Sequence, residues 1–197
     1  MNDFCTRLAE AYAASDLPGQ HRLVYGEGPQ RHPQLMLIGE APGAQEEQQG
    51  RPFVGQAGKN LNEFLRILSL QREQIYITNV VKLRPSRVSP KGTVSNRPPN
   101  RQELLFFRPW LLEEIGLVQP GLIVTLGNTA LQTLQDTVIG SCHGTLRETT
   151  VHGQRYPLFP LYHPASVIYN RSLLDVYRQD LQSLKEILRN LQPGGTD

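Results

Sequence analysis

Apolar residues occur in four short runs that are separated by stretches with helical periodicity. The runs cover residues 35–39, 75–81, 122–127 and 158–162, and each has the length of a buried strand. After the first run, leucine and phenylalanine recur at three- and four-residue spacings, as on one face of a helix. Strands that alternate with helices form a mainly parallel sheet covered on both faces. The pattern therefore predicts an α/β protein with a central four-stranded sheet.

Polar residues indicate where helices begin. Asn100 followed by Glu103 has the spacing of a capping box and predicts a helix that runs to about residue 117. A last long helix is expected after Ser172, and the segment 193–197 is expected to be a frayed tail.

The segment after the first strand is rich in glycine and acidic residues. A helical pattern begins only near residue 59, so residues 40–58 are expected to form one long loop without regular structure. Loops of this length in a compact domain are usually functional or disordered. Ligands bind at the carboxyl ends of parallel strands, where Glu40, Asn79 and His163 all fall. The sequence therefore predicts a functional site at this edge of the sheet.

The residues of this edge each have a structural and a functional interpretation. Phe53 is either a core residue or a platform for a flat ligand, which the neighbouring glycines would allow to approach closely. Asn79 is either a satisfied structural amide or a reader of the edge of a base. His163 is either a polar rim residue or a catalytic group. Glu40, Glu46 and the adjacent acid lack a second group of ligands, so we do not expect a metal site.

Length and charge add two expectations. The 197 residues suit a single domain over 1–197. The sequence has no apolar run of the roughly 20 residues that a membrane span needs and no signal peptide, so we expect a cytoplasmic protein. The net charge is +2, but residues 82–108 alone contain seven basic side chains against one acid, a local charge of +6. This basic segment is either a solvated surface or a patch that contacts phosphates.

Taken together, the motifs resemble the uracil-DNA glycosylase superfamily, and family 4 most closely. The resemblance is carried by residues 39–58, 78–82 and 163–166, in the order and spacing of the family, and it extends over residues 22–190. It implies a three-layer αβα sandwich. It also implies a DNA repair enzyme that flips uracil out of DNA and hydrolyses its N-glycosidic bond, leaving an abasic site.

The resemblance also implies roles for individual residues. Phe53 would stack on uracil, Asn79 would read its Watson–Crick edge, and Glu46 with the surrounding loop would shape the pocket wall. His163 would donate a hydrogen bond to uracil O2, and Glu40 would position the attacking water. The residues expected to bind uracil are thus Ala41, Gly43, Glu46, Phe53 and Asn79, and the catalytic residues are Glu40 and His163.

DNA is the expected partner, and we expect a monomer with no obligate protein partner. Phosphate contacts are expected from Lys82, Arg84, Arg87, Lys91 and Arg97. The turn after His163 is expected to enter the base stack, with contacts from Ser166, Val167, Ile168 and Tyr169. The segment 84–100 is expected to be a basic loop insertion. A cross-linking relative of family 4 has a histidine in a similar loop, whereas Asn96 or Arg97 stands there in this chain, so we expect hydrolysis without a covalent trap.

The chain departs from family 4 at its iron–sulfur site. Members of that family hold a four-iron cluster on four cysteines, but this chain has only Cys5 and Cys142, and neither is at a cluster position. The cluster positions correspond to residues 13–16, Leu83 and Phe107. We therefore predict no cofactor and expect apolar side chains to fill the space of the cluster.

Two other functions remain open. The first is a DNA-binding protein of the same fold that recognises uracil or damage with weak or no hydrolysis. The second is a hydrolase of free nucleosides, which the basic segment disfavours because a free nucleoside offers no phosphate backbone to contact.

Overall fold

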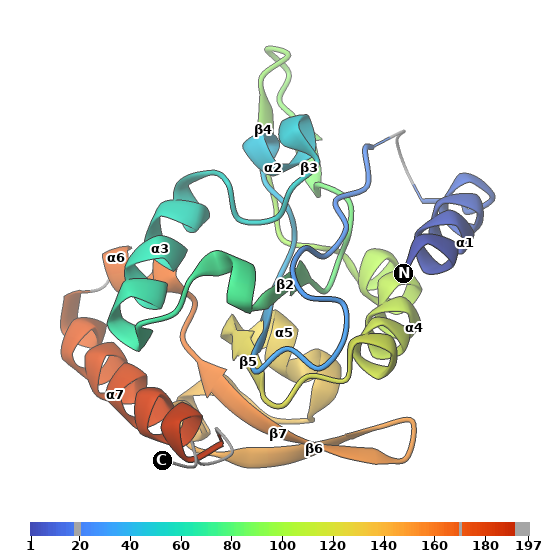
Figure 1. Ribbon diagram of the computed structural model, residues 1–197. Helices are drawn as coiled ribbons and strands as arrows, with labels where there is room; N and C mark the ends of the chain where they lie inside the picture. Colours follow the sequence, from blue (N-terminus) through green and yellow to red (C-terminus); the bar gives the residue numbers. More distant parts are fainter. Residues whose placement is uncertain (18–20, 170, 192–197) are drawn as a thin grey trace.

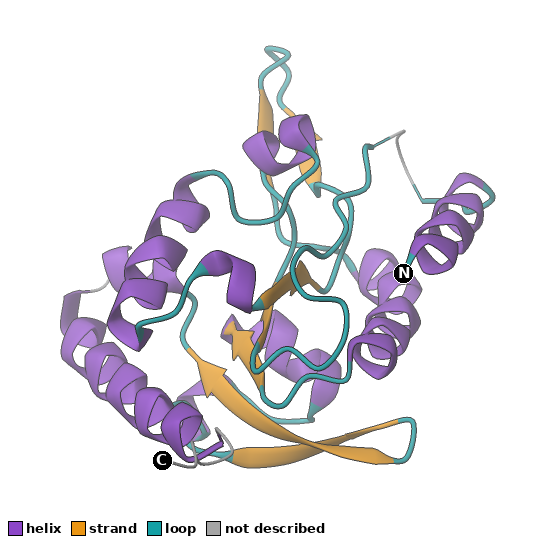
Figure 2. Ribbon diagram, in the orientation of Figure 1, coloured by secondary structure: helices purple, strands orange, loops and turns teal. Residues whose placement is uncertain are grey.

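The computed structural model describes residues 1–17, 21–169 and 171–191, and the side chains of Ile168, Tyr169 and Arg171 lie outside the described part. The central sheet has five strands in the order β2-β1-β5-β7-β6 (Figures 1 and 2). The four strands β2 (Tyr76–Asn79), β1 (Met36–Gly39), β5 (Ile123–Leu126) and β7 (Gln154–Leu161) are parallel. The prediction of a mainly parallel α/β sheet is therefore confirmed.

The expected count of four strands is wrong, because β6 (Arg147–Val151) adds a fifth strand antiparallel to β7. Its sequence is mostly polar, and only Thr149 and Val151 are buried. A strand at the edge of a sheet needs only one apolar face, so the search for continuous apolar runs missed it.

Two groups of helices cover the two faces of the sheet (Figure 1). One core contains residues of α1 (Asn2–Ala13), α4 (Arg101–Val118) and α5 (Gly127–Leu134). The other contains residues of α3 (Gln56–Leu68), α6 (Pro164–Tyr169) and α7 (Leu174–Leu191). Side chains of a strand alternate between faces, and accordingly Met36 and Ile38 pack in the first core while Leu37 packs in the second.

The remaining elements are short. They are α2 (Ala44–Gln49), the hairpin strands β3 (Ser86–Val88) and β4 (Val94–Asn96), and the 3-10 turns Arg72–Gln74, Ile139–Ser141 and Arg171–Leu173. None of the helices in the described ranges is long and apolar enough to cross a membrane. The last six residues, which include the expected frayed tail, lie outside the described residues.

Three local predictions can be compared with these elements. The capping box is confirmed, because Asn100 Oδ1 accepts the Glu103 N–H at 2.9 Å and Glu103 Oε2 accepts the Asn100 N–H at 2.7 Å. The long loop is interrupted by α2, contrary to expectation, because Glu46 caps that helix through the N–H of Gly43. The segment 84–100 is also not a simple loop, since β3 and β4 form an antiparallel hairpin that projects from the body of the molecule (Figure 1).

Candidate active site

A cleft of about 590 Å³ lies at the carboxyl edge of the sheet. Its lining includes Glu40 after β1, Asn79 at the end of β2 and His163 after β7, together with Phe53 from the glycine-rich loop. The structure thus brings together the strand ends that the sequence placed at one edge. Ala41, Gly43 and Glu46 line the same cleft.

Phe53 is held in a backbone conformation that non-glycine residues rarely adopt. Its φ is +52°, in the left-handed region. The Arg72 guanidinium donates hydrogen bonds to the carbonyls of Phe53, at 3.1 Å, and of Pro52. Gly58 lies so close that a Cβ there would be 2.0 Å from the Phe53 oxygen. These contacts fix the Phe53 main chain, and the residue, which is only 5% exposed, lines the cleft.

Asn79 presents a buried carboxamide beside this ring. The residue is 2% exposed and lines the cleft. A Cβ on Gly39, its partner in β1, would lie 2.4 Å from Asn79 Oδ1 and 2.5 Å from Phe53 Cζ, so only glycine fits there. Within the described residues no hydrogen bond to this carboxamide is found, and the residue borders the cleft. Its polar atoms are therefore available to a ligand.

His163 is positioned as a hydrogen-bond donor. The Ala165 backbone N–H donates to His163 Nδ1 at 3.2 Å, so in the neutral ring the proton is assigned to Nε2. Burial lowers the pKa of His163 below its ordinary value, and the nearby Glu40 carboxylate opposes this shift only in part. The imidazole is therefore neutral near pH 7 and has one N–H available.

Glu40 and Thr129 form a contact that sequence reasoning missed. The Thr129 hydroxyl, on α5, donates to Glu40 Oε2 at 2.5 Å, and no hydrogen bond to the other carboxylate oxygen is found among the described residues. Thr129 lines the same cleft, directly after the third parallel strand. Because it follows a buried strand, the sequence could have placed Thr129 at this edge of the sheet, but it gives no reason to pair Thr129 with Glu40.

Glu46 braces the loop that forms one wall. The residue is 6% exposed, and its carboxylate accepts the N–H groups of Val54 at 3.1 Å, Gly55 at 2.7 Å and Gly43 at 3.1 Å. These bonds join α2 to the segment that carries the aromatic platform. Although Glu46 lines the cleft, its oxygens are already engaged by the backbone, so it shapes the wall rather than offering a free acceptor.

Two predicted DNA contacts are contradicted. Lys82 is fully buried and forms an ion pair with Glu114, so it cannot reach a phosphate. Val167 is 7% exposed and packs in the core with α3 and α7, so it is not an exposed wedge. Ser166 is exposed and lines the cleft, whereas the side chains of Ile168 and Tyr169 lie outside the described part.

The other basic residues divide into two groups. Arg84 bonds to Asn96 Oδ1 at 2.8 Å and lies 3.4 Å from Glu47, and Arg97 forms two bonds with Glu103 at 2.7 and 2.8 Å. These contacts hold the base of the hairpin against the body. Arg87 and Lys91 are exposed on the projecting part, which carries no carboxylate.

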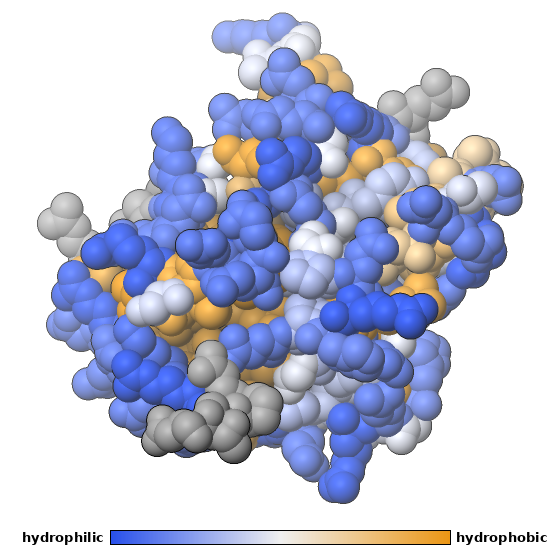
Figure 3. Space-filling view, in the orientation of Figure 1, coloured by the Kyte–Doolittle hydropathy of each residue, from blue (hydrophilic) through white to orange (hydrophobic). Residues whose placement is uncertain are grey.

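The same hairpin exposes an apolar pair. Val88 is 67% exposed and Val94 is 49% exposed, and the two face each other across the strands. Figure 3 shows hydrophilic and hydrophobic surface side by side on this projection. The base of the hairpin reaches the cleft, because Pro85, Asn96 and Arg97 belong to its lining.

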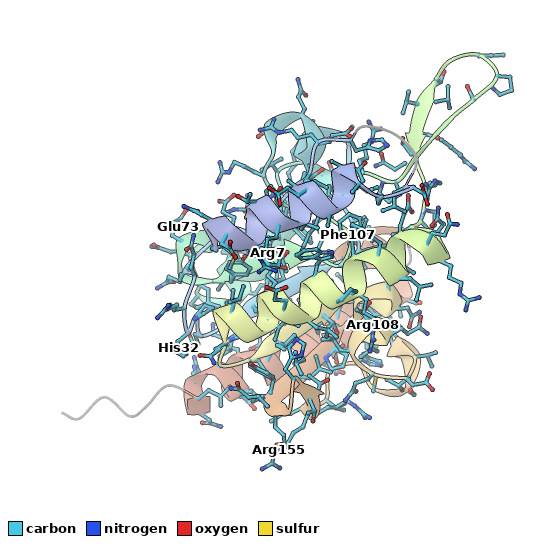
Figure 4. All side chains as sticks on the ribbon, turned by 90° about the vertical axis from the view of Figure 1, so that its right-hand side faces the viewer. Arg7, His32, Glu73, Phe107, Arg108 and Arg155 are labelled. Atoms are coloured by element: carbon cyan, nitrogen blue, oxygen red, sulfur yellow. The ribbon has the colours of Figure 1, made fainter. Side chains whose placement is uncertain are left out.

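Two of the positions that the resemblance assigns to cluster cysteines, residues 83 and 107, are filled by apolar packing, whereas Ala13, Ala14 and Asp16 are exposed. Leu83 is 1% exposed and Phe107 is 0% exposed, and both belong to the core beneath α1 and α4. The ring of Tyr12 lies 6.4 Å from the rings of Phe106 and Phe107, and Figure 4 shows Phe107 on α4 near α1. The described residues include no group of three or more His, Cys, Asp or Glu placed to hold a metal ion. These residues do not fit an iron–sulfur cluster, which requires thiolate ligands.

Comparison with known proteins identifies the family of the chain. A family model described as the uracil DNA glycosylase superfamily matches residues 25–192. The chain is similar to the type-4 uracil-DNA glycosylase of Saccharolobus solfataricus, with 37% identity over 84% of this chain and 76% of the relative. It is also similar to the type-4 enzymes of Archaeoglobus fulgidus, with 35% identity over 81% and 79%, and of Thermotoga maritima, with 34% identity over 85% and 83%. The chain therefore belongs to the uracil-DNA glycosylase superfamily.

Proposed function

We propose that the protein is a monofunctional uracil-DNA glycosylase that releases uracil from DNA and leaves an abasic site. The observation that carries the proposal is the cleft in which an aromatic ring, an unpartnered carboxamide, a neutral imidazole N–H and a carboxylate converge. The names of the relatives, type-4 uracil-DNA glycosylases, support the same reaction.

Base recognition follows from Phe53 and Asn79. A base stacked in DNA is out of reach, so the nucleotide is extruded at a cost of a few kcal/mol. The ring of Phe53 stacks on the extruded uracil, while the Asn79 carboxamide donates to its O4 and accepts from its N3–H. Cytosine has an amino group at C4 and an unprotonated N3, so buried polar groups would be left without partners and the wrong base is rejected.

Bond cleavage follows from His163 and Glu40. Negative charge develops on uracil O2 as the N-glycosidic bond breaks, and the Nε2–H of His163 donates to that oxygen. A preorganised donor of this kind typically contributes about 3–4 kcal/mol to the lowering of the barrier. Glu40, oriented by the Thr129 hydroxyl, holds the water that attacks C1′ and accepts its proton. The reaction needs no metal ion.

In this proposal the bound DNA extends from the cleft along the β3–β4 hairpin. Arg87 and Lys91 contact phosphates, and Arg84 and Arg97 support the hairpin at its base. The exposed pair Val88 and Val94 replaces the buried Val167 as the apolar contact to sugars or bases, since a two-stranded ribbon fits a groove of DNA.

The absence of an iron–sulfur cluster is part of the proposal. Leu83 and Phe107 take two of the four cluster positions that the resemblance implies and contribute apolar burial there in place of thiolate ligands. Iron analysis and visible absorbance of protein purified without oxygen test this statement. Stoichiometric iron and sulfide would contradict it.

The activity is tested with a single-stranded oligonucleotide that contains one deoxyuridine, followed by alkali. The proposed enzyme leaves an alkali-cleavable abasic site, whereas a DNA-binding protein without hydrolysis shifts the oligonucleotide but leaves it intact. Asn79→Ala and His163→Ala should each reduce uracil release by at least about 10²-fold while the proteins remain folded. Free deoxyuridine serves as the control for a nucleoside hydrolase and should not be cleaved.

A further inference from the structure

A fully buried ion pair lies behind the cleft. Lys82, which follows β2, and Glu114, on α4, are each 0% exposed, and Lys82 Nζ lies 2.6 Å from Glu114 Oε2. Neither residue is part of the cleft lining. Because the attraction within a buried pair often fails to offset the loss of hydration, the pair needs an explanation other than stability.

Every proton of the Lys82 ammonium group has an acceptor. Nζ donates to Glu114 Oε2, to Thr78 Oγ1 and to the backbone carbonyl of Asn79, each at 2.6 Å. The third bond is the important one, because Asn79 carries the carboxamide that faces the cleft. The buried cation therefore holds the main chain of the residue that we propose reads the base.

Glu114 is held in turn by two hydroxyl groups. Tyr76 Oη donates to Glu114 Oε1 at 2.9 Å, and Thr78 Oγ1 donates to the carboxylate at 3.2 Å. Burial and the Glu114 charge raise the pKa of Tyr76, so its phenol stays protonated and remains a donor. A Cβ on Gly26 would lie 2.4 Å from Tyr76 Oη and 2.5 Å from Glu114 Oε1, so the main chain of residue 26 closes over the network. These contacts therefore hold the Lys82 side chain in a single position.

The position of Asn79 explains why it needs this support. It is the last residue of β2, an edge strand of the sheet that pairs with β1 on one side and forms an isolated bridge between Ile77 and Glu27 on the other. A strand end has fewer hydrogen bonds than the strand interior, and the chain leaves the sheet directly after it. Two residues beyond that bridge, the Lys82 ammonium group donates to the Asn79 carbonyl.

We propose that the Lys82–Glu114 pair is a positioning device for base recognition, which fixes the peptide plane of Asn79 and so aims its carboxamide into the cleft. The inference rests on the proposed function, in which that carboxamide reads uracil. Lys82 and Glu114 act through Asn79 and touch neither base nor water.

The test uses the double variant K82M/E114Q. It removes both charges together, while the amide of the new glutamine still accepts from Tyr76 and still has Thr78 as a partner. We expect a folded protein with single-turnover uracil release slower by about 10- to 100-fold, because small displacements of a recognition group cost rates of this order. Glu113→Gln is the matched control, since Glu113 lies next to Glu114 on α4 but pairs with Arg7 at the surface. It should release uracil at the wild-type rate.

A double-mutant cycle distinguishes positioning from general loosening. In an Asn79→Ala background there is no carboxamide left to aim, so adding K82M/E114Q should slow the residual reaction no further. An additive loss in that background, or a wild-type rate for K82M/E114Q alone, would overturn the inference while leaving the proposed function intact. Wild-type protein that releases no uracil would overturn both.

Thr78→Val gives the same test without removing a charge. The substitution deletes one of the three acceptors of Lys82 and keeps the Glu114 pair. We expect a smaller loss of uracil release, again absent in the Asn79→Ala background. If K82M/E114Q does not fold, Thr78→Val replaces it as the test of the inference. A decrease in the rate of uracil release that is additive with that of Asn79→Ala would then overturn the inference.

Discussion

Replacing Arg72 by methionine should disorder the aromatic platform of the cleft. Arg72 is 17% exposed at its side chain and donates to the carbonyls of Pro52 and Phe53. Methionine retains much of the apolar stem but removes both donors. Phe53 would then have to keep its left-handed backbone, at a cost of about 1–2 kcal/mol, without the bonds that now stabilise it.

The magnitude follows from the two hydrogen bonds. A bond from a charged donor contributes about 1.5–3 kcal/mol, so the pair contributes at most about 6 kcal/mol. Water can reach part of this site and replaces some of the loss, so we expect the free energy of unfolding to fall by about 2–4 kcal/mol. Uracil release should fall as well, with a higher KM, because the ring of Phe53 no longer holds one orientation in the cleft.

Arg51→Met is the matched control. Arg51 and Arg72 both lie beside Glu27, and the hydrogen bond from Arg51 is the main cause of the lowered pKa of Glu27. Arg51 is 55% exposed at its side chain, and the cleft lining does not include it. Its loss should therefore change stability by no more than about 1 kcal/mol and leave uracil release unchanged. Denaturant unfolding and steady-state kinetics of both variants, measured side by side, decide the matter. Equal effects of the two substitutions on KM would refute the reasoning.

Three further predictions follow from the site. Removing two cations with R87Q/K91Q should weaken DNA binding and reduce the dependence of the affinity on salt concentration. If a salt titration gave the same slope for this variant and the wild type, the hairpin would not contact phosphates. The pKa of His163 is lower in the folded protein than its ordinary value of 6.5. As the pH falls through 6.5, this imidazole therefore binds a proton in the unfolded chain but not in the folded protein, and the free energy of unfolding decreases. Unfolding of His163→Gln should lack this loss between about pH 7 and 5, and an identical pH dependence would show that burial does not perturb the imidazole. Gly39→Ala should nearly abolish uracil release, because the new methyl group would overlap the Asn79 side chain; a variant with normal kcat/KM would mean that the cleft is far more adaptable than its packing implies.

The sequence was enough to predict the alternation of strands and helices and several residues of the cleft. Parallel strands end at one edge of a sheet, so the order of the motifs was enough to gather Glu40, Asn79 and His163. The capping box of α4 was equally local, since its two partners are three residues apart.

What the sequence alone could not determine depends on contacts between distant residues. Lys82 looked like a surface cation until the fold placed Glu114, 32 positions later, against its ammonium group. The exposed turn expected at Val167 became part of the core because α3 and α7 cover it. Periodicity reports which side of an element is apolar, but burial of a charge or of a loop residue depends on what packs against it, and only the tertiary structure decides that.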